Sequence, residues 1–414
     1  MLTRQPGKNE SRTLALLGGL CFFLTVFEYL IPKPLPFMRI GLANLPLLLA
    51  LDILTTKNFF LLALIKVLGQ GIVGGTLFSY VFLFSIAGTF SSASVMYILR
   101  ALSRKKQTGF TGLGCAGAMA SNTVQLVLAR YLVFGPAIRY LIPPFLAAGF
   151  ITGTVLGLAC EFFCKRSKWY TAQTAGGNTP AVQRNAENQY TLPPEKTVLQ
   201  SKKETVRPGR YEKWNRFFNA DELFVTGLIM ILLFLFCRSM PGRIIQFVFF
   251  SLIAFISGKK INLLSTLPVM AGIVFFNLLV PYGKIIAVFG PLLITQGSLV
   301  SGIEKAVTLQ GLATLSAAFI KSNLKLPGGI GALLGKSLRI LEELRERSGI
   351  AGQSGTRESV IEKLDRTMLE LESAETEDLN IQPGKTGRSV KKILLLSGMV
   401  IITAAAGVIP RLYI

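Results

Sequence analysis

The chain of 414 residues is 51% hydrophobic, its mean hydropathy is +0.52, and several apolar runs approach the ~20 residues that a helix needs to cross a bilayer. This composition excludes an ordinary soluble domain and predicts an all-α, polytopic protein of the cell membrane. The formal net charge is +22, but the basic residues cluster in short loops between apolar runs, so we expect the lipid bilayer as partner and no nucleic acid.

Histidine is absent from the sequence, which excludes histidine-based zinc sites, histidine-ligated haem and Ser-His-Asp catalysis. We interpret the five cysteines as small apolar helix residues, because they fall within or at the ends of apolar runs: Cys21, Cys115, Cys160, Cys164 and Cys237. Cys160 and Cys164 lie one helical turn apart and would bind a soft metal only with further ligands, which the sequence does not indicate. We expect no metal ion and no cofactor.

The first half of the chain contains six predicted spans, near residues 13–30, 40–54, 59–78, 79–99, 110–133 and 140–164. The first follows a polar, basic lead as a signal peptide would, but no small-residue cleavage site follows, so we interpret it as a span. With this count, the N-terminus and the basic loops at 100–106 and 165–168 lie on one side, which the positive-inside rule makes cytoplasmic.

Polar side chains at the mouth of the second span and inside the third are the main candidates for substrate binding. Lipid offers no hydrogen bonds, so Arg39, Asn44, Lys66 and Gln70 must be satisfied by protein, ligand or water. Arg39 could instead snorkel to the interface, whereas Lys66 lies farther from a span end. Pro46 removes a hydrogen bond from the first turns, so we expect irregular backbone before it. Further candidates in later segments are Ser79, Asn122 and Gln125.

Small residues follow these polar positions along the chain. Gly71, Gly74, Gly75 and Gly88 allow neighbouring helix backbones to approach closely. Packing and ligand contact are both open for these glycines, and we favour packing because glycine is common in membrane helices for that reason alone.

The run Arg39-Ile-Gly-Leu-Ala-Asn44, followed by Lys66, the glycine cluster 69–75, Leu77-Phe78-Ser79 and residues 87–91, resembles the Gx transporter family, also called heptaprenyl diphosphate synthase component I. The resemblance covers roughly residues 12–165. It implies a domain of six membrane helices at 1–166, similar to the substrate-binding S components of energy-coupling factor transporters.

Residues 167–216 are rich in Gly, Asn, Gln, Thr, Pro and Lys and poor in apolar side chains. Too little apolar surface is present to offset the entropy of ordering, so this stretch is predicted to be a disordered cytoplasmic linker. It separates domain 1–166 from a second membrane domain at 217–414.

The second half has predicted spans near residues 223–237, 244–256, 261–279, 285–299, 307–320 and 393–409. Between the last two, about 331–378, leucines at helical spacing alternate with charged residues, which predicts amphipathic cytoplasmic helices. They could alternatively lie on the bilayer surface.

This layout, with the run Gly311-Leu-Ala-Thr-Leu-Ser316 to Leu326-Pro-Gly328, resembles the transmembrane T component of energy-coupling factor transporters. The resemblance implies separate ATPase subunits as partners. The Ala-Arg-Gly type motif by which coupling helices contact the ATPases is not evident in this sequence.

Two enzymatic motifs fail on inspection. A phosphate loop ending at Lys336-Ser337 would require glycine where Ile330 stands, and no strand precedes it. Prenyl transfer requires clustered aspartates to hold Mg²⁺, and the sequence contains no two adjacent aspartates. We therefore expect the chain not to be an enzyme.

Two functional hypotheses remain. The chain is either a substrate-binding transport protein joined to a T-like module, or a non-catalytic membrane subunit of polyprenyl diphosphate or quinone biosynthesis. The first predicts that the polar candidates converge on one cavity, and the second predicts an apolar groove with a basic mouth. Basic groups at an apolar pocket would suit an amphipathic anion or a flavin-like or quinone-like ligand.

Arg39→Ala is expected to abolish retention of the small-molecule substrate while the protein still folds and inserts. Arg39→Lys should restore retention only in part, because lysine lacks the planar fork of the guanidinium. Mass spectrometry of ligand extracted from the purified variants measures this. Unchanged retention in Arg39→Ala would make the residue an interfacial anchor.

Overall fold

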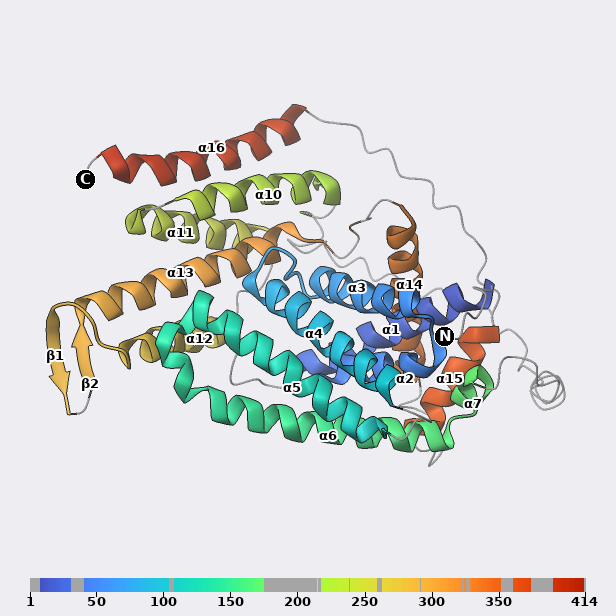
Figure 1. Cartoon of the computed structure of the whole chain (residues 1–414). Coiled ribbons are helices and arrows are strands. Elements are labelled where there is room, and N and C mark those ends of the chain that lie inside the picture. Colours follow the sequence, from blue (N-terminus) through green and yellow to red (C-terminus); the bar gives the residue numbers. More distant parts are fainter. Residues whose placement is uncertain are drawn as a thin grey trace.

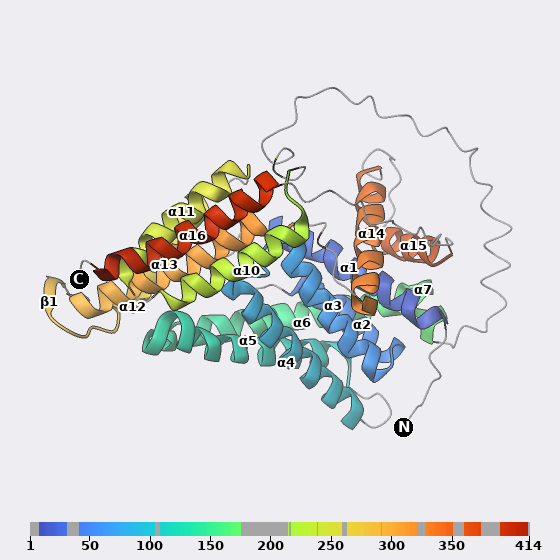
Figure 2. The same ribbon diagram turned by 90° about the horizontal axis from the view of Figure 1, so that it is seen from above.

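The computed structural model describes residues 8–30, 41–103, 108–174, 214, 217–237, 239–258, 263–290, 292–321, 324, 328–350, 360–373 and 390–412. The described residues form two helical bundles, one from the first half of the chain and one from the second, with two helices from near the C-terminus lying against the first bundle (Figures 1 and 2). The predicted all-α membrane fold is confirmed.

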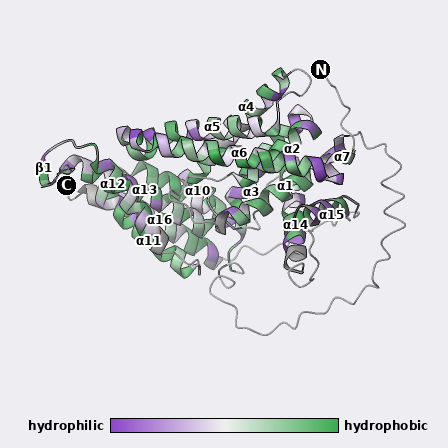
Figure 3. Ribbon diagram, turned by 90° about the horizontal axis from the view of Figure 1, so that it is seen from below, coloured by the Kyte–Doolittle hydropathy of each residue, from purple (hydrophilic) through white to green (hydrophobic). Residues whose placement is uncertain are grey.

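The first bundle contains the helices α1 (Lys8–Leu30), η1 (Leu42–Asn44), α2 (Leu45–Ile53), α3 (Thr56–Val73), α4 (Tyr80–Leu102), α5 (Phe110–Ala129), η3 (Arg130–Phe134), η4 (Gly135–Tyr140), α6 (Ile142–Arg166) and α7 (Lys168–Thr174). Five candidate spans are long and apolar enough to cross a membrane, and all belong to this half of the described chain. Hydrophobic residues dominate these helices, whereas hydrophilic residues gather near α7 (Figure 3).

The second predicted span is shorter than expected. Its helical part runs only from Leu42 to Ile53, about 18 Å of helix against a hydrocarbon core of about 30 Å. Side chains of α2 are fully enclosed by the other helices, including Leu47, Leu48, Leu49 and Ala50. The segment is therefore a buried half-length helix that begins inside the bundle.

The loops predicted to be cytoplasmic meet at one end of the first bundle. Arg100 binds Asp52 through two hydrogen bonds of 3.0 and 2.5 Å, and Tyr170 donates to the same carboxylate over 3.0 Å. Burial raises the pKa of Tyr170, and the charge of Asp52 adds to the effect. Glu10 accepts a bond of 2.8 Å from the Thr55 amide, which brings the start of α1 to this end. The side of the membrane stays a prediction.

Glycines bring α5 and α6 into backbone contact. A Cβ added to Gly114 would lie 2.7 Å from the carbonyl oxygen of Gly153, and one added to Gly157 would lie 2.5 Å from that of Phe110. Such distances are shorter than the van der Waals contact between a carbon and an oxygen atom, so this packing requires glycine at both positions.

The second bundle contains α10 (Ala220–Phe236), α11 (Met240–Ile256), α12 (Leu263–Leu278), α13 (Gln296–Phe319) and α16 (Val390–Leu412). The prediction of a span at 285–299 is wrong: β1 (Ile285–Phe289) and β2 (Leu292–Thr295) form an antiparallel hairpin there. Gly283 and Gly290 have positive φ angles, which helices do not accommodate, and the run is rich in β-branched residues. Helix α13 consequently begins at Gln296, well before the predicted start at 307.

The predicted linker lies mostly outside the described residues, but its first part is folded. Helix α7 occupies residues 168–174, and its Trp169 is fully buried. The backbone amides of Lys168 and Trp169 donate to Asp365 over 3.0 and 3.1 Å, and Ser167 bonds the same carboxylate. A contact with a distant helix therefore orders the start of this polar stretch.

The predicted amphipathic region forms α14 (Gly328–Ile350) and α15 (Val360–Ser373). Helix α14 crosses α1, and α15 lies beside α7 (Figures 1 and 2). The apolar side chains Leu334, Leu344, Met368 and Leu371 are buried in the core of the first bundle. Protein covers these apolar faces, so they are not available to a bilayer surface.

The two bundles also meet directly. The turn between α3 and α4 packs against α10 and α13, where the Ser316 hydroxyl donates to the Gly75 carbonyl over 2.7 Å and accepts from the Phe78 amide over 2.9 Å. Phe78 packs against Phe224, with ring centroids 5.1 Å apart, and over Gly227. The α3–α4 turn, residues 74–79, is thus a joint between the two halves.

Gly157→Ala is expected to lower the free energy of unfolding by about 1–3 kcal/mol, because the added methyl would press into the backbone of α5. Gly112→Ala is the matched control: a Cβ there meets nothing within 4 Å and should stabilise the helix by about 0.5–1 kcal/mol. Thermal unfolding in detergent measures both. Equal effects of the two substitutions would contradict the close contact.

Candidate functional site

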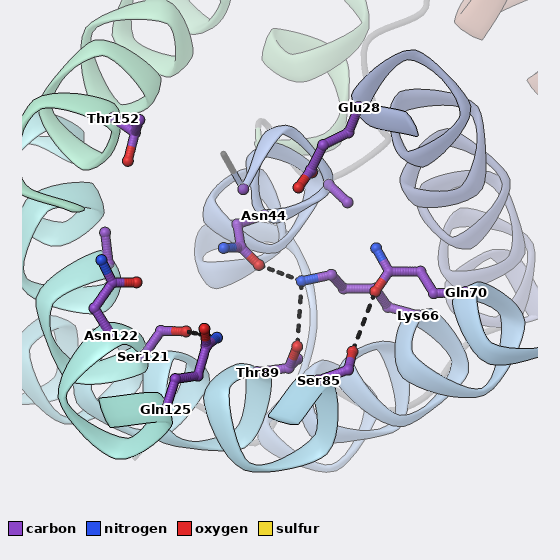
Figure 4. A pocket seen from close by; sticks show the side chains of 13 residues that line it. Glu28, Asn44, Lys66, Gln70, Ser85, Thr89, Ser121, Asn122, Gln125 and Thr152 are labelled. Atoms are coloured by element: carbon purple, nitrogen blue, oxygen red, sulfur yellow. Dashed lines mark hydrogen bonds between the residues drawn. The ribbon is translucent and has the colours of Figure 1, made fainter. Parts of the chain in front are cut away.

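A small polar cavity lies inside the first bundle, enclosed by α1, η1, α3, α4, α5 and α6 (Figure 4). Its volume is about 30 Å³, enough for one or two water molecules. The lining residues are Glu28, Gly41, Ala43, Asn44, Lys66, Gln70, Ser85, Thr89, Ala118, Ser121, Asn122, Gln125 and Thr152. Only the glycine and the two alanines lack a polar side chain.

The start of α2 builds one wall of this cavity. Gly41 has φ +88°, a conformation that favours glycine, and a 3-10 turn follows it to Asn44. Pro46 then occupies the first turn of α2, where its missing amide hydrogen costs nothing. The irregular backbone expected before Pro46 is confirmed for residues 41–44. The helix begins there and directs its N-terminus, the positive end of its dipole, towards the cavity.

Lys66 and Gln70 stand four residues apart on α3 and therefore share a face of the helix. The Lys66 ammonium, only 3% exposed, donates to Asn44 Oδ1 and, over 3.4 Å, to Thr89 Oγ1 (Figure 4). Gln70 donates to Thr25 over 2.7 Å and accepts from Ser85 over 3.4 Å. Helices α1, η1 and α4 are thus tied to α3 around the cavity.

Gln125 and Asn122 on α5 close the opposite wall. Gln125 Nε2 donates to Ser121 over 3.1 Å, while Gln125 Oε1 has no hydrogen-bond partner among the described residues although the side chain is only 3% exposed. Asn122 donates to the Phe145 carbonyl over 2.8 Å. The cavity therefore presents a buried acceptor that protein does not satisfy.

Five of the residues predicted to bind substrate line this one cavity: Asn44, Lys66, Gln70, Asn122 and Gln125. Ser79 does not, because its hydroxyl donates to Thr76 at the α3–α4 turn. Arg39 lies outside the described residues. Binding of substrate by these residues stays a prediction.

The four predicted packing glycines serve different contacts. Gly71 packs against Leu77 and Phe82, Gly74 ends α3, and Gly75 has φ +61° in the α3–α4 turn. Gly88 lies against Ser121 and Gln125, where a side chain would displace the Gln125 amide. Gly88 thus makes the room that Gln125 occupies.

Several lining residues were missed in the sequence, among them Glu28, Ser85, Thr89, Ser121 and Thr152. A signal existed for three of them, because Ser85 and Thr89 are four residues apart within an apolar helix, and Ser121 is four residues before the predicted Gln125. Such spacing places both side chains on one face of the helix. The candidates Lys66 and Gln70 on α3 have the same spacing.

The lining consists of amides, hydroxyls, one ammonium and one carboxylate. Among the residues that the structure describes, no group of three or more cysteine, aspartate or glutamate side chains is placed to hold a metal ion. The arrangement is chemically suited to hydrogen-bonding a polar ligand in a region shielded from water.

Two family models match separate parts of the chain, one in each half. Residues 17–163 match the family model described as heptaprenyl diphosphate synthase component I, and residues 223–322 match a domain of unknown function, DUF8519. No curated protein and no solved structure matches the chain. The first match supports the resemblance to heptaprenyl diphosphate synthase component I and contains every residue lining the cavity, while the resemblance to transporter components stays a prediction.

Proposed function

We propose that this chain is a membrane transport protein whose first half binds a small polar substrate and whose second half couples binding to transport. The observation that carries the proposal is the convergence of Lys66, Asn44, Gln70 and Gln125 on one enclosed cavity. Buried polar groups in a membrane bundle are costly to maintain, and substrate pathways are a common reason for them.

The alternative is a non-catalytic membrane subunit of polyprenyl diphosphate or quinone biosynthesis, which the family description of residues 17–163 favours. That role needs an apolar groove for a prenyl chain. Among the described lining residues, Ala43 and Ala118 are the only apolar side chains, so the chemistry of the cavity favours the transport proposal.

Helix α1 is suited to couple the two halves. Glu28 of α1 lines the cavity, and Thr25 accepts a hydrogen bond from Gln70. Two turns earlier, Gly19 lies against α14, where an added Cβ would be 2.5 Å from the Ile340 side chain and 3.0 Å from the Ser337 carbonyl. Substrate that shifts α1 at the cavity would move α14 through this contact.

Separate ATPase subunits would complete such a transporter. Helices α14 and α15 turn their apolar faces to the first bundle and leave charged residues exposed, among them Lys336, Arg339, Glu342, Glu343, Arg366 and Glu370. We propose this exposed charged surface as the contact for an ATPase.

Lys66→Met is expected to reduce retention of the co-purifying ligand at least about tenfold, because a charged hydrogen-bond donor is lost at nearly unchanged volume. Mass spectrometry of extracts from purified full-length protein measures retention. Lys305→Met is the matched control, since the Lys305 ammonium also binds an asparagine oxygen, Asn277 Oδ1 at 2.9 Å, but in the second bundle. Equal retention in the two variants would contradict the proposed site.

Gly19→Leu is expected to keep ligand retention but to reduce cellular uptake of that ligand several-fold, because the side chain would separate α14 from α1. Gly335→Leu on α14 serves as control, because a Cβ there meets nothing within 4 Å. Normal uptake with Gly19→Leu, in protein shown to be folded, would rule out coupling through this contact.

A further inference from the structure

The chemistry of the cavity limits the charge of its ligand. Lys66 and Glu28 are its two charged lining residues among those described, and both are almost fully buried, at 3% and 4% exposure. Their formal charges cancel. A ligand with net charge would bring an uncompensated ion into a site shielded from bulk water, which is costly in a low-dielectric interior.

The cavity also sets which hydrogen-bonding groups the ligand must carry. Gln125 Oε1 is a buried acceptor without a partner among the described residues, so it requires a donor from whatever occupies the cavity. In the described orientation, Gln125 Nε2 donates to Ser121 and lies against Gly88, which leaves Oε1 as the amide atom that needs a donor.

Four carboxamides and four hydroxyls make up most of the lining. Protein bonds both ends of the Gln70 amide, the Asn44 oxygen and the Asn122 nitrogen, whereas Gln125 Oε1 has no partner among the described residues. A ligand edge that pairs an N–H with a carbonyl meets the Gln125 acceptor with its donor and the hydroxyl and N–H groups of the lining with its acceptor. No aromatic side chain of the described residues lines the cavity, so these residues offer no ring on which a ligand could stack.

We infer that this site binds a small molecule of zero net charge that carries an amide-type edge, an N–H donor beside a carbonyl acceptor. The cavity of about 30 Å³ holds only one or two water molecules, so the lining helices must move apart to admit such a ligand. The N–H donates to Gln125 Oε1, and the carbonyl accepts from the donors around Lys66 and Asn44. This inference rests on the proposed function and narrows its substrate class, because it excludes prenyl diphosphates and other anions as ligands of this site.

The test uses purified full-length protein and two matched probe pairs at millimolar concentration: pyrrolidone with its N-methyl derivative, and uracil with its dimethyl derivative. Each derivative keeps the carbonyl and lacks the N–H. We expect at least one parent compound to raise the thermal unfolding midpoint and its derivative not to do so. Farnesyl diphosphate is included as an anionic probe.

Gln125→Leu should abolish the stabilisation by the parent compound, an affinity loss of about tenfold or more. Gln246→Leu is the matched control. Gln246 is also buried, donates to the Thr403 carbonyl over 2.8 Å and has an Oε1 atom without a partner among the described residues, but it lies in the second bundle. Its substitution should leave the response to the probe unchanged.

Several outcomes would overturn the inference: no response to either parent compound, an equal response to the methylated derivatives, or an unchanged response in Gln125→Leu. A Lys66-dependent response to farnesyl diphosphate alone would overturn the inference about ligand class while leaving a binding site in place. If wild-type protein and Lys66→Met also carried the same extracted molecules in equal amounts, the proposed function would fail as well.

Discussion

The cavity depends on one constraint: a lysine ammonium buried among membrane helices must have hydrogen-bond acceptors within reach. Lys66 finds them in Asn44 and Thr89, and Asn44 is available only because η1 and α2 begin inside the bundle. Gly41 and Pro46 fix that starting point through backbone conformation. The half-length second helix therefore supplies the acceptor that the buried ammonium of Lys66 requires.

The polar part of this arrangement was accessible from the sequence. Five polar residues interrupt apolar segments: Asn44, Lys66, Gln70, Asn122 and Gln125. Lipid cannot form hydrogen bonds with them, so their side chains must turn towards the interior of the bundle, where they meet at one cavity. Glu28 was missed because it stands near the end of its span, where a carboxylate at the interface would need no explanation. Ser85 and Thr89 were missed because single hydroxyls are also common in packing contacts.

Other features could not be predicted from hydropathy. Residues 285–299 are as apolar as a span, and only the glycine turns and β-branched residues distinguish the observed hairpin from a helix. The position of α14 across α1 depends on the fit of Gly18 and Gly19 to Ser337 and Ile340, a contact between segments more than 300 residues apart. Amphipathic periodicity shows that a face must be covered, but it does not identify the covering surface.

The joint between the α3–α4 turn and helices α10 and α13 connects the two halves of the chain by non-covalent contacts. Ser316 bonds both Gly75 and Phe78, and Phe78 fits over Gly227, so the halves recognise each other through shape and hydrogen bonds as two subunits would. A covalent connection between two such surfaces raises the effective concentration of one half near the other. Two separately synthesised halves would carry the same complementary surfaces, so a gene split within the linker could encode the same assembly.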